Sequence, residues 1–225
     1  LGEKVLMNKK RLLGILLSIT LILGLTPGIC MTARADGPYN IWIAGVQVTD
    51  TNKNNVIEGI AGTSGVVSYN PDNNTLTLNN ANITYDSSTS AAIQIGNIGN
   101  DLTIKLEGNN NIRHNENDSL WYGIRSSGTN ITIIGSSSDS DLLTVSCDYG
   151  VCTASGGIAI RNSKVTITSI NHGLYSSSGK IIIENSIVNT TSTYSYGICS
   201  SANDIIIKNG NVTATGASTG INTKT

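Results

Sequence analysis

The sequence predicts an all-β protein that folds as a right-handed parallel β-helix, a solenoid of about 23 residues per coil, with an N-terminal β cap. The first observation is a motif of an aromatic or polar residue, Gly, an aliphatic residue, one variable residue, and Ser or Thr. Its glycines are spaced 27, 23, 24 and 23 residues apart, at Gly123, Gly150, Gly173, Gly197 and Gly220. A fixed period of this size is typical of one small unit stacked many times.

The second observation is an aliphatic-x-aliphatic pair followed by Asn, which recurs with the same period. Residues 76–85 align without gaps to residues 158–167, and the frame continues at residues 181–190 and 205–214. Alternation with period 2, many β-branched residues and the lack of a helical stripe indicate strands. Three short strands per unit, each with inward aliphatic residues, then close a triangular core that only stacked coils can bury.

The first 35 residues are expected to be upstream sequence and a secretory signal peptide. From Met7 the chain reads basic residues at 9–11, an apolar run over residues 12–25, and then Ala33-Arg34-Ala35. A run too short for a comfortable membrane span, followed by a small-x-small exit, is typical of a leader cleaved after Ala35. We therefore expect a secreted or cell-surface protein that meets the membrane only through this leader.

Cleavage of the leader changes the charge of the chain. The leader holds 5 of the 14 basic residues and 1 of the 15 acidic residues, so the mature chain has 9 basic and 14 acidic groups and a net charge of −5. An acidic, lysine-poor surface argues against nucleic acid as a partner. A polyanion would need a bridging cation.

Residues 36–75 differ from the repeats and predict the β cap. Residues 41–48 alternate cleanly between apolar and polar, and a second strand pair flanks the turn over residues 70–74. Such a cap protects the open edge of the first coil. Residues 76–225 are expected to form the solenoid. Because the chain stops at the end of a complete motif, we interpret it as a fragment truncated at the C-terminus.

Three columns of residues are expected at the corners of the coils: an Asn column, the motif glycines, and the tyrosines that precede those glycines. Asn tolerates a left-handed backbone and can form an amide ladder, so one Asn column is interpreted as structural. The motif glycines mark a close turn or an outward position where bulk is unwelcome. By strand parity the tyrosines before them face inward and stack. The Asn column is Asn80, Asn162, Asn185 and Asn209, and the tyrosines are Tyr122, Tyr149 and Tyr196.

The outward columns argue against catalysis within this stretch. Neither holds the pair of acids that glycoside hydrolysis needs. One column is Thr103, Thr132, Ala159, Ile182 and Ile206, and the other is Thr84, Thr144, Thr166, Asn189 and Thr213. Polar inserts at residues 108–111 and 136–141 interrupt the repeat, and inserts of this kind are expected to emerge as binding loops.

Sugar binding asks for exposed aromatic rings with polar neighbours. Trp42, Trp121, Tyr175 and Tyr194 are the aromatic residues with the best expected exposure, and Arg125 is the only basic residue of its outward column. These five are the candidate carbohydrate-binding residues. Each aromatic residue also has a structural interpretation, as a ring packed on its own coil.

Residues 39–49 and 67–83, with the repeated Ile-x-Ile-x-Asn and Tyr-Gly-Ile units, resemble the entry region of secreted repeat proteins from Gram-positive, clostridia-like bacteria. Such proteins are grouped as carbohydrate-binding-domain proteins with a pectate-lyase-like right-handed β-helix. The characterised kind binds plant cell-wall polysaccharide and calcium, so the resemblance implies both. It assigns no calcium ligand to a particular position here.

The densest carboxylate group is the candidate metal site. Asp139, Asp141 and Asp148 lie close in sequence, and several oxygen donors brought together can hold calcium. A solvated acidic loop explains the same residues.

The expected function is non-catalytic binding of plant or microbial cell-wall polysaccharide at the bacterial surface, with calcium as the cofactor. One alternative is an adhesin-like stalk, in which the solenoid spaces other domains. A second alternative is a polysaccharide lyase or hydrolase whose active site lies beyond Thr225.

Overall fold

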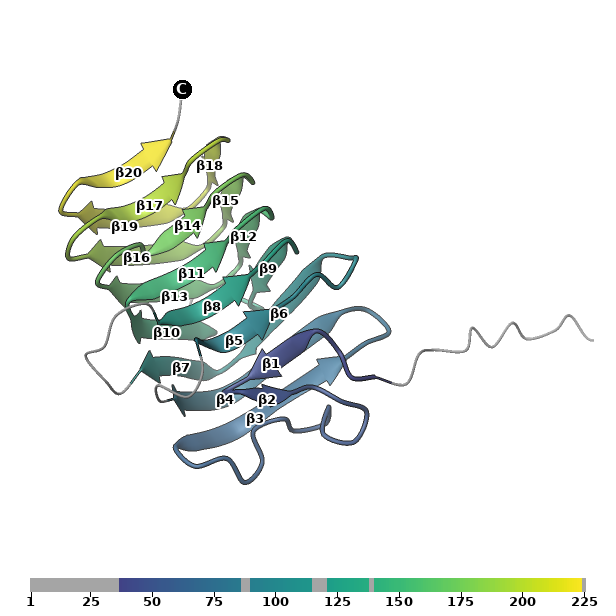
Figure 1. The fold of residues 1–225 in the computed structure, drawn as a ribbon. Helices are drawn as coiled ribbons and strands as arrows, with labels where there is room; N and C mark the ends of the chain where they lie inside the picture. The colour runs from purple at the N-terminus through teal and green to yellow at the C-terminus, as the bar shows by residue number, and fades with distance from the viewer. Residues whose placement is uncertain (1–36, 86–89, 115–120, 138–139, 224–225) are drawn as a thin grey trace, which may run out of the picture. The chain divides into compact units, whose positions relative to one another are not determined.

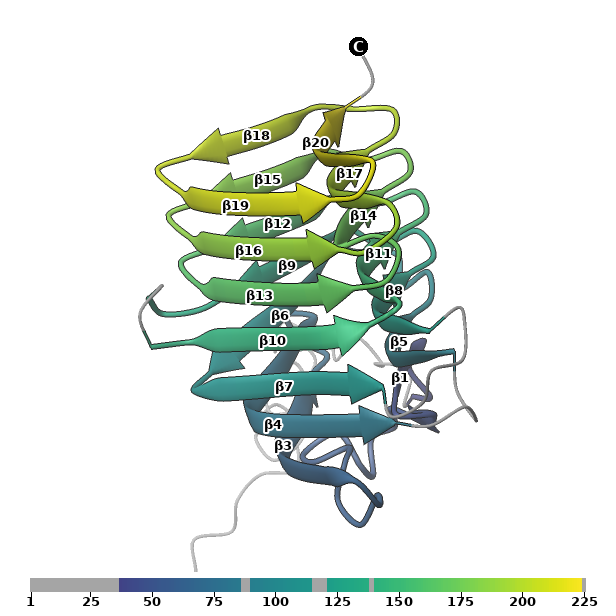
Figure 2. The same ribbon diagram turned by 90° about the vertical axis from the view of Figure 1, so that its left-hand side faces the viewer.

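The computed structural model describes residues 37–85, 90–114, 121–137 and 140–223, called here the described residues. The predicted signal peptide, residues 1–35, lies outside them. They form an all-β parallel β-helix of about 6 turns with about 24 residues per turn, which confirms the predicted fold class. The coils rise in a right-handed sense (Figure 2). In this part of the chain no helix is long and apolar enough to cross a membrane.

One side of the solenoid is an eight-stranded sheet with the order β2-β1-β5-β8-β11-β14-β17-β20. From β5 onward its strands are parallel and each coil contributes one of them (Figure 1). The strands are β1 (Ile41–Ile43), β2 (Val46–Gln47), β5 (Ala91–Ile95), β8 (Tyr122–Ser126), β11 (Tyr149–Thr153), β14 (Leu174–Ser176), β17 (Tyr196–Ser200) and β20 (Thr219–Thr223).

The other two sides belong to one twelve-stranded sheet that bends at a corner. Long strand β4 crosses the bend: its first half pairs with β6 and its second half pairs with β7. Each later coil has two separate strands here, one on each side of the bend. The first side holds β6 (Leu102–Glu107), β9 (Ile131–Ile134), β12 (Ile158–Arg161), β15 (Ile181–Glu184) and β18 (Ile205–Lys208). The second holds β7 (Asn109–His114), β10 (Leu142–Cys147), β13 (Lys164–Ser169), β16 (Ile187–Ser192) and β19 (Asn211–Gly216), with β3 (Thr63–Asn70) beside β4 (Thr75–Tyr85).

Aliphatic side chains from all three sides meet in one continuous core, as the inward columns predict. Ile160, Val165 and Leu174 represent the three sides in one coil, and each is 0% exposed. The gapless alignment of residues 76–85 with residues 158–167 is wrong by two residues, because Leu76 stands in the row of Ile160. A shift of two keeps the parity of a strand, so the predicted inward residues still face inward.

The Asn column occupies the bend of the twelve-stranded sheet. Asn80, Asn162, Asn185 and Asn209 have φ values between 47° and 50°, which confirms the predicted left-handed backbone. At Asn162 and Asn185 the bonds that cross to the next coil are backbone bonds, such as Asn162 N–H to the carbonyl of Glu184. At Asn80 the side chain also crosses, because its Oδ1 accepts from the N–H of Asn109 at 3.2 Å. The left-handed backbone is thus the feature that all four corners share.

The motif glycines face the interior and leave no room for a side chain. A Cβ at Gly150 would lie 2.5 Å from Cγ2 of Ile167 and nearer still to the carbonyl oxygen of Gly173 in the next coil. A Cβ at Gly123 would lie 2.8 Å from the carbonyl oxygen of Gly150. The expectation of an outward position is therefore wrong, while the expectation that bulk is unwelcome is confirmed.

The Ser or Thr that ends each motif closes the turn after the strand. Ser126 Oγ donates to the carbonyl of Thr129 at 2.8 Å and accepts from its N–H at 3.0 Å. Ser176 Oγ donates to the carbonyl of Gly156 at 2.9 Å and accepts from the N–H of Gly179 at 2.8 Å. These hydroxyls are buried, so the bonds satisfy turn groups that water does not reach.

The N-terminal strands pair antiparallel with the first coil. β1 pairs with both β2 and β5, and β3 pairs along β4 with a register shift between Ser64 and Val66. Val48, Val56 and Val67 are buried in this region and join the core. Antiparallel strands at this end agree with a cap, and the limits at residues 36 and 75 stay a prediction.

The last coil of the described residues is more exposed than those before it. Ile207 and Ile221 are each 41% exposed, whereas Ile183 and Ile198 in the preceding coil are 0% exposed. β18, β19 and β20 pair on one edge only. Among the described residues their other edges have no partner strand.

Candidate functional site

The outer face of the eight-stranded sheet brings three of the five candidate carbohydrate-binding residues into one row. Trp42 lies opposite Gln94, which lies opposite Arg125, and Tyr175 follows two strands later. Neighbouring strands are about 4.8 Å apart, so the row from Trp42 to Tyr175 spans about 19 Å. The full row is Trp42, Gln94, Arg125, Cys152, Tyr175, Cys199 and Asn222.

A second row runs beside it and consists of stacked rings. Tyr122 and Tyr149 have ring centroids 4.7 Å apart and an interplanar angle of 21°. His172 lies 5.7 Å from Tyr149 and 5.6 Å from Tyr196. Tyr175 of the first row stacks on His172 at 4.6 Å and 13°, which joins the two rows.

The two rows enclose a depression of about 360 Å³, which we call the aromatic groove. Its ten lining residues include one cation, Arg125, and no carboxylate. They are Tyr122, Arg125, Ser126, Tyr149, Cys152, Thr153, Ala154, His172, Tyr175 and Ser177.

The predicted inward position of the tyrosines is wrong, although their stacking is confirmed. Tyr122 and Tyr149 are half-buried and line the groove from its side. The buried glycine after each tyrosine interrupts the strand pairing, since Tyr149 pairs with Tyr122 and Val151 with Ile124 while Gly150 has no such partner. Parity counted across that interruption therefore assigns the tyrosine to the wrong side.

The charges of the groove are arranged for polar recognition. The Arg125 guanidinium lies 4.8 Å from the ring centroid of Tyr122, within the range of a cation–π contact. No carboxylate among the described residues pairs with Arg125. Burial raises the pKa of Tyr122 and Tyr149, so both phenols remain neutral donors and acceptors.

His172 lines the groove as a neutral ring. Burial lowers the pKa of its imidazole, so the ring is neutral at neutral pH. Its Nδ1 is buried and makes no hydrogen bond within the described residues. Neighbouring rings cover the faces of His172, so the groove presents ring edges, phenol oxygens and the guanidinium.

Trp121 and Tyr194 lie outside the aromatic groove. Trp121 precedes β8, stacks on His114 at 4.9 Å and packs against the core, and its backbone N–H donates to Asp148. Tyr194 is 71% exposed in the turn between β16 and β17. Trp42 shares the row of the groove but lies three strands from Cys152 at its centre.

Two of the three candidate metal ligands, Asp141 and Asp148, do not come together. Asp139 lies outside the described residues. Asp141 and Asp148 stand at opposite ends of β10, about 20 Å apart. Burial alone would raise the pKa of Asp141, but hydrogen bonds from Ser136 and Gly108 outweigh it and lower the pKa. Within the described residues no three His, Cys, Asp or Glu side chains form a group that could hold a metal.

Asp141 instead anchors the insert that precedes β10. Its carboxylate accepts bonds from the N–H of Gly108 at 3.0 Å and from the N–H and hydroxyl of Ser136 at 2.6 and 2.5 Å. The other predicted insert is not a loop, because residues 109–111 begin β7. Asp141 and Asp148 therefore do not share a calcium ion, and a role of Asp139 stays a prediction.

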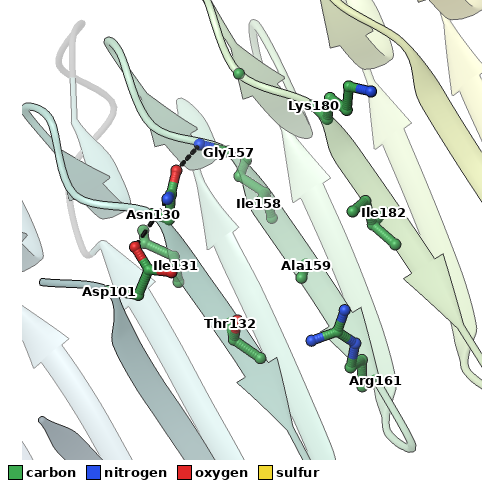
Figure 3. A pocket seen from close by; sticks show the side chains of 11 residues that line it. Asp101, Asn130, Ile131, Thr132, Gly157, Ile158, Ala159, Arg161, Lys180 and Ile182 are labelled. Carbon is green, nitrogen blue, oxygen red and sulfur yellow. Dashed lines mark hydrogen bonds between the residues drawn. The ribbon is translucent and has the colours of Figure 1, made fainter.

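A second groove of about 330 Å³ lies on the side formed by β6, β9, β12 and β15 (Figure 3). Asn130 donates to Asp101 and accepts from the N–H of Gly157, at 2.8 and 2.7 Å. Arg161 is held by Glu184 at 2.9 Å, so its charge is already paired. This side confirms the outward column that contains Thr132, Ala159 and Ile182.

No protein-family model, curated protein or solved structure matches this chain.

Proposed function

We propose that this chain is a secreted, non-catalytic β-helix protein that binds cell-wall polysaccharide in the aromatic groove. The observation that carries the proposal is the convergence of Arg125, Tyr122, Tyr149 and Tyr175 with neutral His172 around one open depression. Sugar hydroxyls need several fixed donors and acceptors beside apolar surface, and this groove offers both.

The open shape and the row structure support a polymer rather than a small molecule. Each coil adds one residue to each row, so the two rows run along the solenoid axis past both ends of the groove. An extended glycan lying along the axis would meet Gln94 and Trp42 beyond Arg125, and Asn222 beyond Tyr175. Several weak contacts in a line give useful affinity when they act together.

Affinity gel electrophoresis against plant and microbial cell-wall polysaccharides tests the proposal. We expect the parent chain to be retarded by at least one glycan, and Arg125→Ala and Tyr175→Ala to reduce the retardation. Tyr194→Ala is the matched control, because it removes an exposed tyrosine outside the groove. Equal loss in all three variants, or no loss in the two groove variants, would reject the groove as the site.

Calcium dependence is tested in the same gels. The resemblance implies calcium, whereas Asp141 and Asp148 are too far apart to share an ion. We expect retardation to survive a chelator. A strict calcium requirement would place the ion on residues other than these two.

The predicted leader, residues 1–35, is the support for secretion. We expect expression in a Gram-positive host to release a chain that begins at Asp36, measured by N-terminal sequencing. An uncleaved chain held at the membrane would contradict this part of the proposal.

The adhesin-like stalk and the enzyme predict different outcomes. The uniform stacking of coils favours the stalk as the second candidate, and a chain that no glycan retards would support it. Unsaturated or newly reducing products from a retarded glycan would indicate a lyase or hydrolase.

A further inference from the structure

The side of the solenoid opposite the second groove across the Asn corner carries a regular array of small polar side chains. β10, β13, β16 and β19 pair in parallel over six consecutive residues without a shift in register. Their outward positions therefore form straight rows across the sheet. Figure 2 shows these four strands side by side with nearly parallel axes.

Two adjacent rows make up the array, which we call the hydroxyl grid. One row is Thr144, Thr166, Asn189 and Thr213, and the other is Ser146, Thr168, Thr191 and Thr215. Residues in a row are about 4.8 Å apart, and the two rows are about 6.6 Å apart. Seven of the eight residues present a hydroxyl group.

The hydroxyls of the grid have no side-chain partners among the described residues. None of the seven, and not the Asn189 amide, makes a side-chain hydrogen bond to another described residue. The buried hydroxyls on the opposite side of the core, such as Ser126 and Ser176, are all engaged in turns. The grid is therefore a set of donors and acceptors that only an external partner can satisfy.

The grid is also held in fixed positions. Thr is β-branched and has few χ1 rotamers, and the ladder beneath it fixes the backbone. A surface that is already ordered loses little conformational entropy on binding. A regular partner with matching spacing can engage all rows together.

Charge selects the class of partner. The grid itself contains no charged residue, and the flanking cations are Lys164 and Arg113 at its border. An uncharged lattice of hydroxyl donors and acceptors, interleaved with Thr methyl groups, complements another uncharged lattice of the same kind. The absence of an aromatic ring from the eight grid positions disfavours a sugar surface, which packs on rings.

We propose that the hydroxyl grid binds the surface of ice through water molecules that its hydroxyls hold in a lattice-like pattern. Ice is a neutral crystal in which every oxygen donates and accepts, and its shortest lattice repeat is close to the spacing of about 4.8 Å along a row of the grid. The proposal uses a different side of the solenoid from the aromatic groove and does not rest on it.

Ice-affinity partition and thermal hysteresis of the full chain test the inference. We expect the parent chain to be enriched in slowly grown ice and to give hysteresis that rises with concentration. Thr168→Tyr and Thr191→Lys place bulk or charge in the grid and should abolish both signals. Thr103→Tyr makes the same kind of change on β6, on another side of the solenoid, and should retain them.

Circular dichroism checks that each variant unfolds at the temperature of the parent. A parent chain excluded from ice overturns the proposal, and so does equal loss in the Thr103→Tyr control. Loss of glycan binding or of self-association in the grid variants, without any ice signal from the parent, would assign the grid to that other partner and equally overturn it.

Discussion

At the scale of single residues, the motif is explained by how little space separates neighbouring coils. The aliphatic residue fills the core, the Ser or Thr closes the turn, and the glycine lets two backbones approach. At Gly150 the carbonyl of the next glycine occupies the volume that a Cβ would need. A glycine column of this kind is a steric requirement of stacking.

Gly150→Ala should therefore destabilise the fold. Overpacking of a tight interior costs about 1–3 kcal/mol, and here the obstacle includes backbone that cannot rotate away. Urea unfolding followed by circular dichroism measures the effect. Gly128→Ala is the control, because nothing lies within 4 Å of its added Cβ, and its effect should stay below about 1 kcal/mol. Similar losses at both positions would show that space is not the reason for the glycine.

His172 should give the fold a pH dependence. Burial lowers its folded pKa below the ordinary 6.5, so the unfolded chain binds the proton more tightly. Stability is then full above about pH 6.5 and falls as the pH drops, until the folded ring also protonates. Melting temperatures between about pH 8 and about pH 5 measure this loss. His172→Phe keeps an aromatic ring in the stack and should flatten that part of the profile, and an unchanged slope would rule out His172 as its source.

At the scale of elements, each coil depends on the turn that leaves the eight-stranded sheet. Ser176 links this turn to the preceding coil through Gly156 and to its own coil through Gly179. One buried hydroxyl thus connects the turns of two neighbouring coils and fixes their spacing along the solenoid axis. The groove residue Tyr175 is its immediate neighbour in β14, so the turn also supports the site.

Ser176→Ala should cost about 1–3 kcal/mol, since it leaves the Gly179 N–H without its partner and removes one of the two hydroxyls that donate to the buried Gly156 carbonyl, the other being that of Thr153. Thermal unfolding provides the measurement. Ser178→Ala changes an exposed serine two residues later and should alter stability by less than about 0.5 kcal/mol. If the two variants melt alike, the turn does not depend on the Ser176 hydroxyl.

At the scale of the whole molecule, stability should vary along the solenoid axis. Each coil contacts mainly its neighbours, so local opening is easiest where the apolar residues of a coil are most exposed. Hydrogen exchange should therefore be fastest in β18, β19 and β20, whose apolar residues are the more exposed, and slowest in β10 to β16. Uniform protection from one end to the other would indicate a single cooperative unit.

Much of the fold could be predicted from the sequence, because the same pattern of inward, corner and turn residues recurs in several coils. The period, the inward columns and the left-handed Asn corner all depend on local pattern, and all three are confirmed. The groove could be predicted only in part. Arg125 and Tyr175 follow from strand parity, whereas Tyr122, Tyr149 and His172 lie beyond an interruption at glycine that parity does not describe.

The remaining differences between prediction and structure arise where residues close in sequence lie far apart in space, or where aligned residues lie at different positions in the sheet. Asp141 and Asp148 are seven residues apart in the chain, yet a strand carries them to opposite ends of one side. The register of the first coil is shifted by two on both halves of β4, which a gapless alignment of sequences does not reveal. Sequence spacing measures chain length, and an extended strand converts that length into distance.

The constant register of the parallel strands has a consequence for how such a molecule can change size. Lys164 pairs with Ile187 and Ile187 with Asn211, so the same position returns after 23 or 24 residues. Inserting or deleting one such unit would lengthen or shorten every side by one strand and leave all other pairings as they were. Avidity for an extended partner could then be adjusted in steps of one coil, without redesign of any single contact.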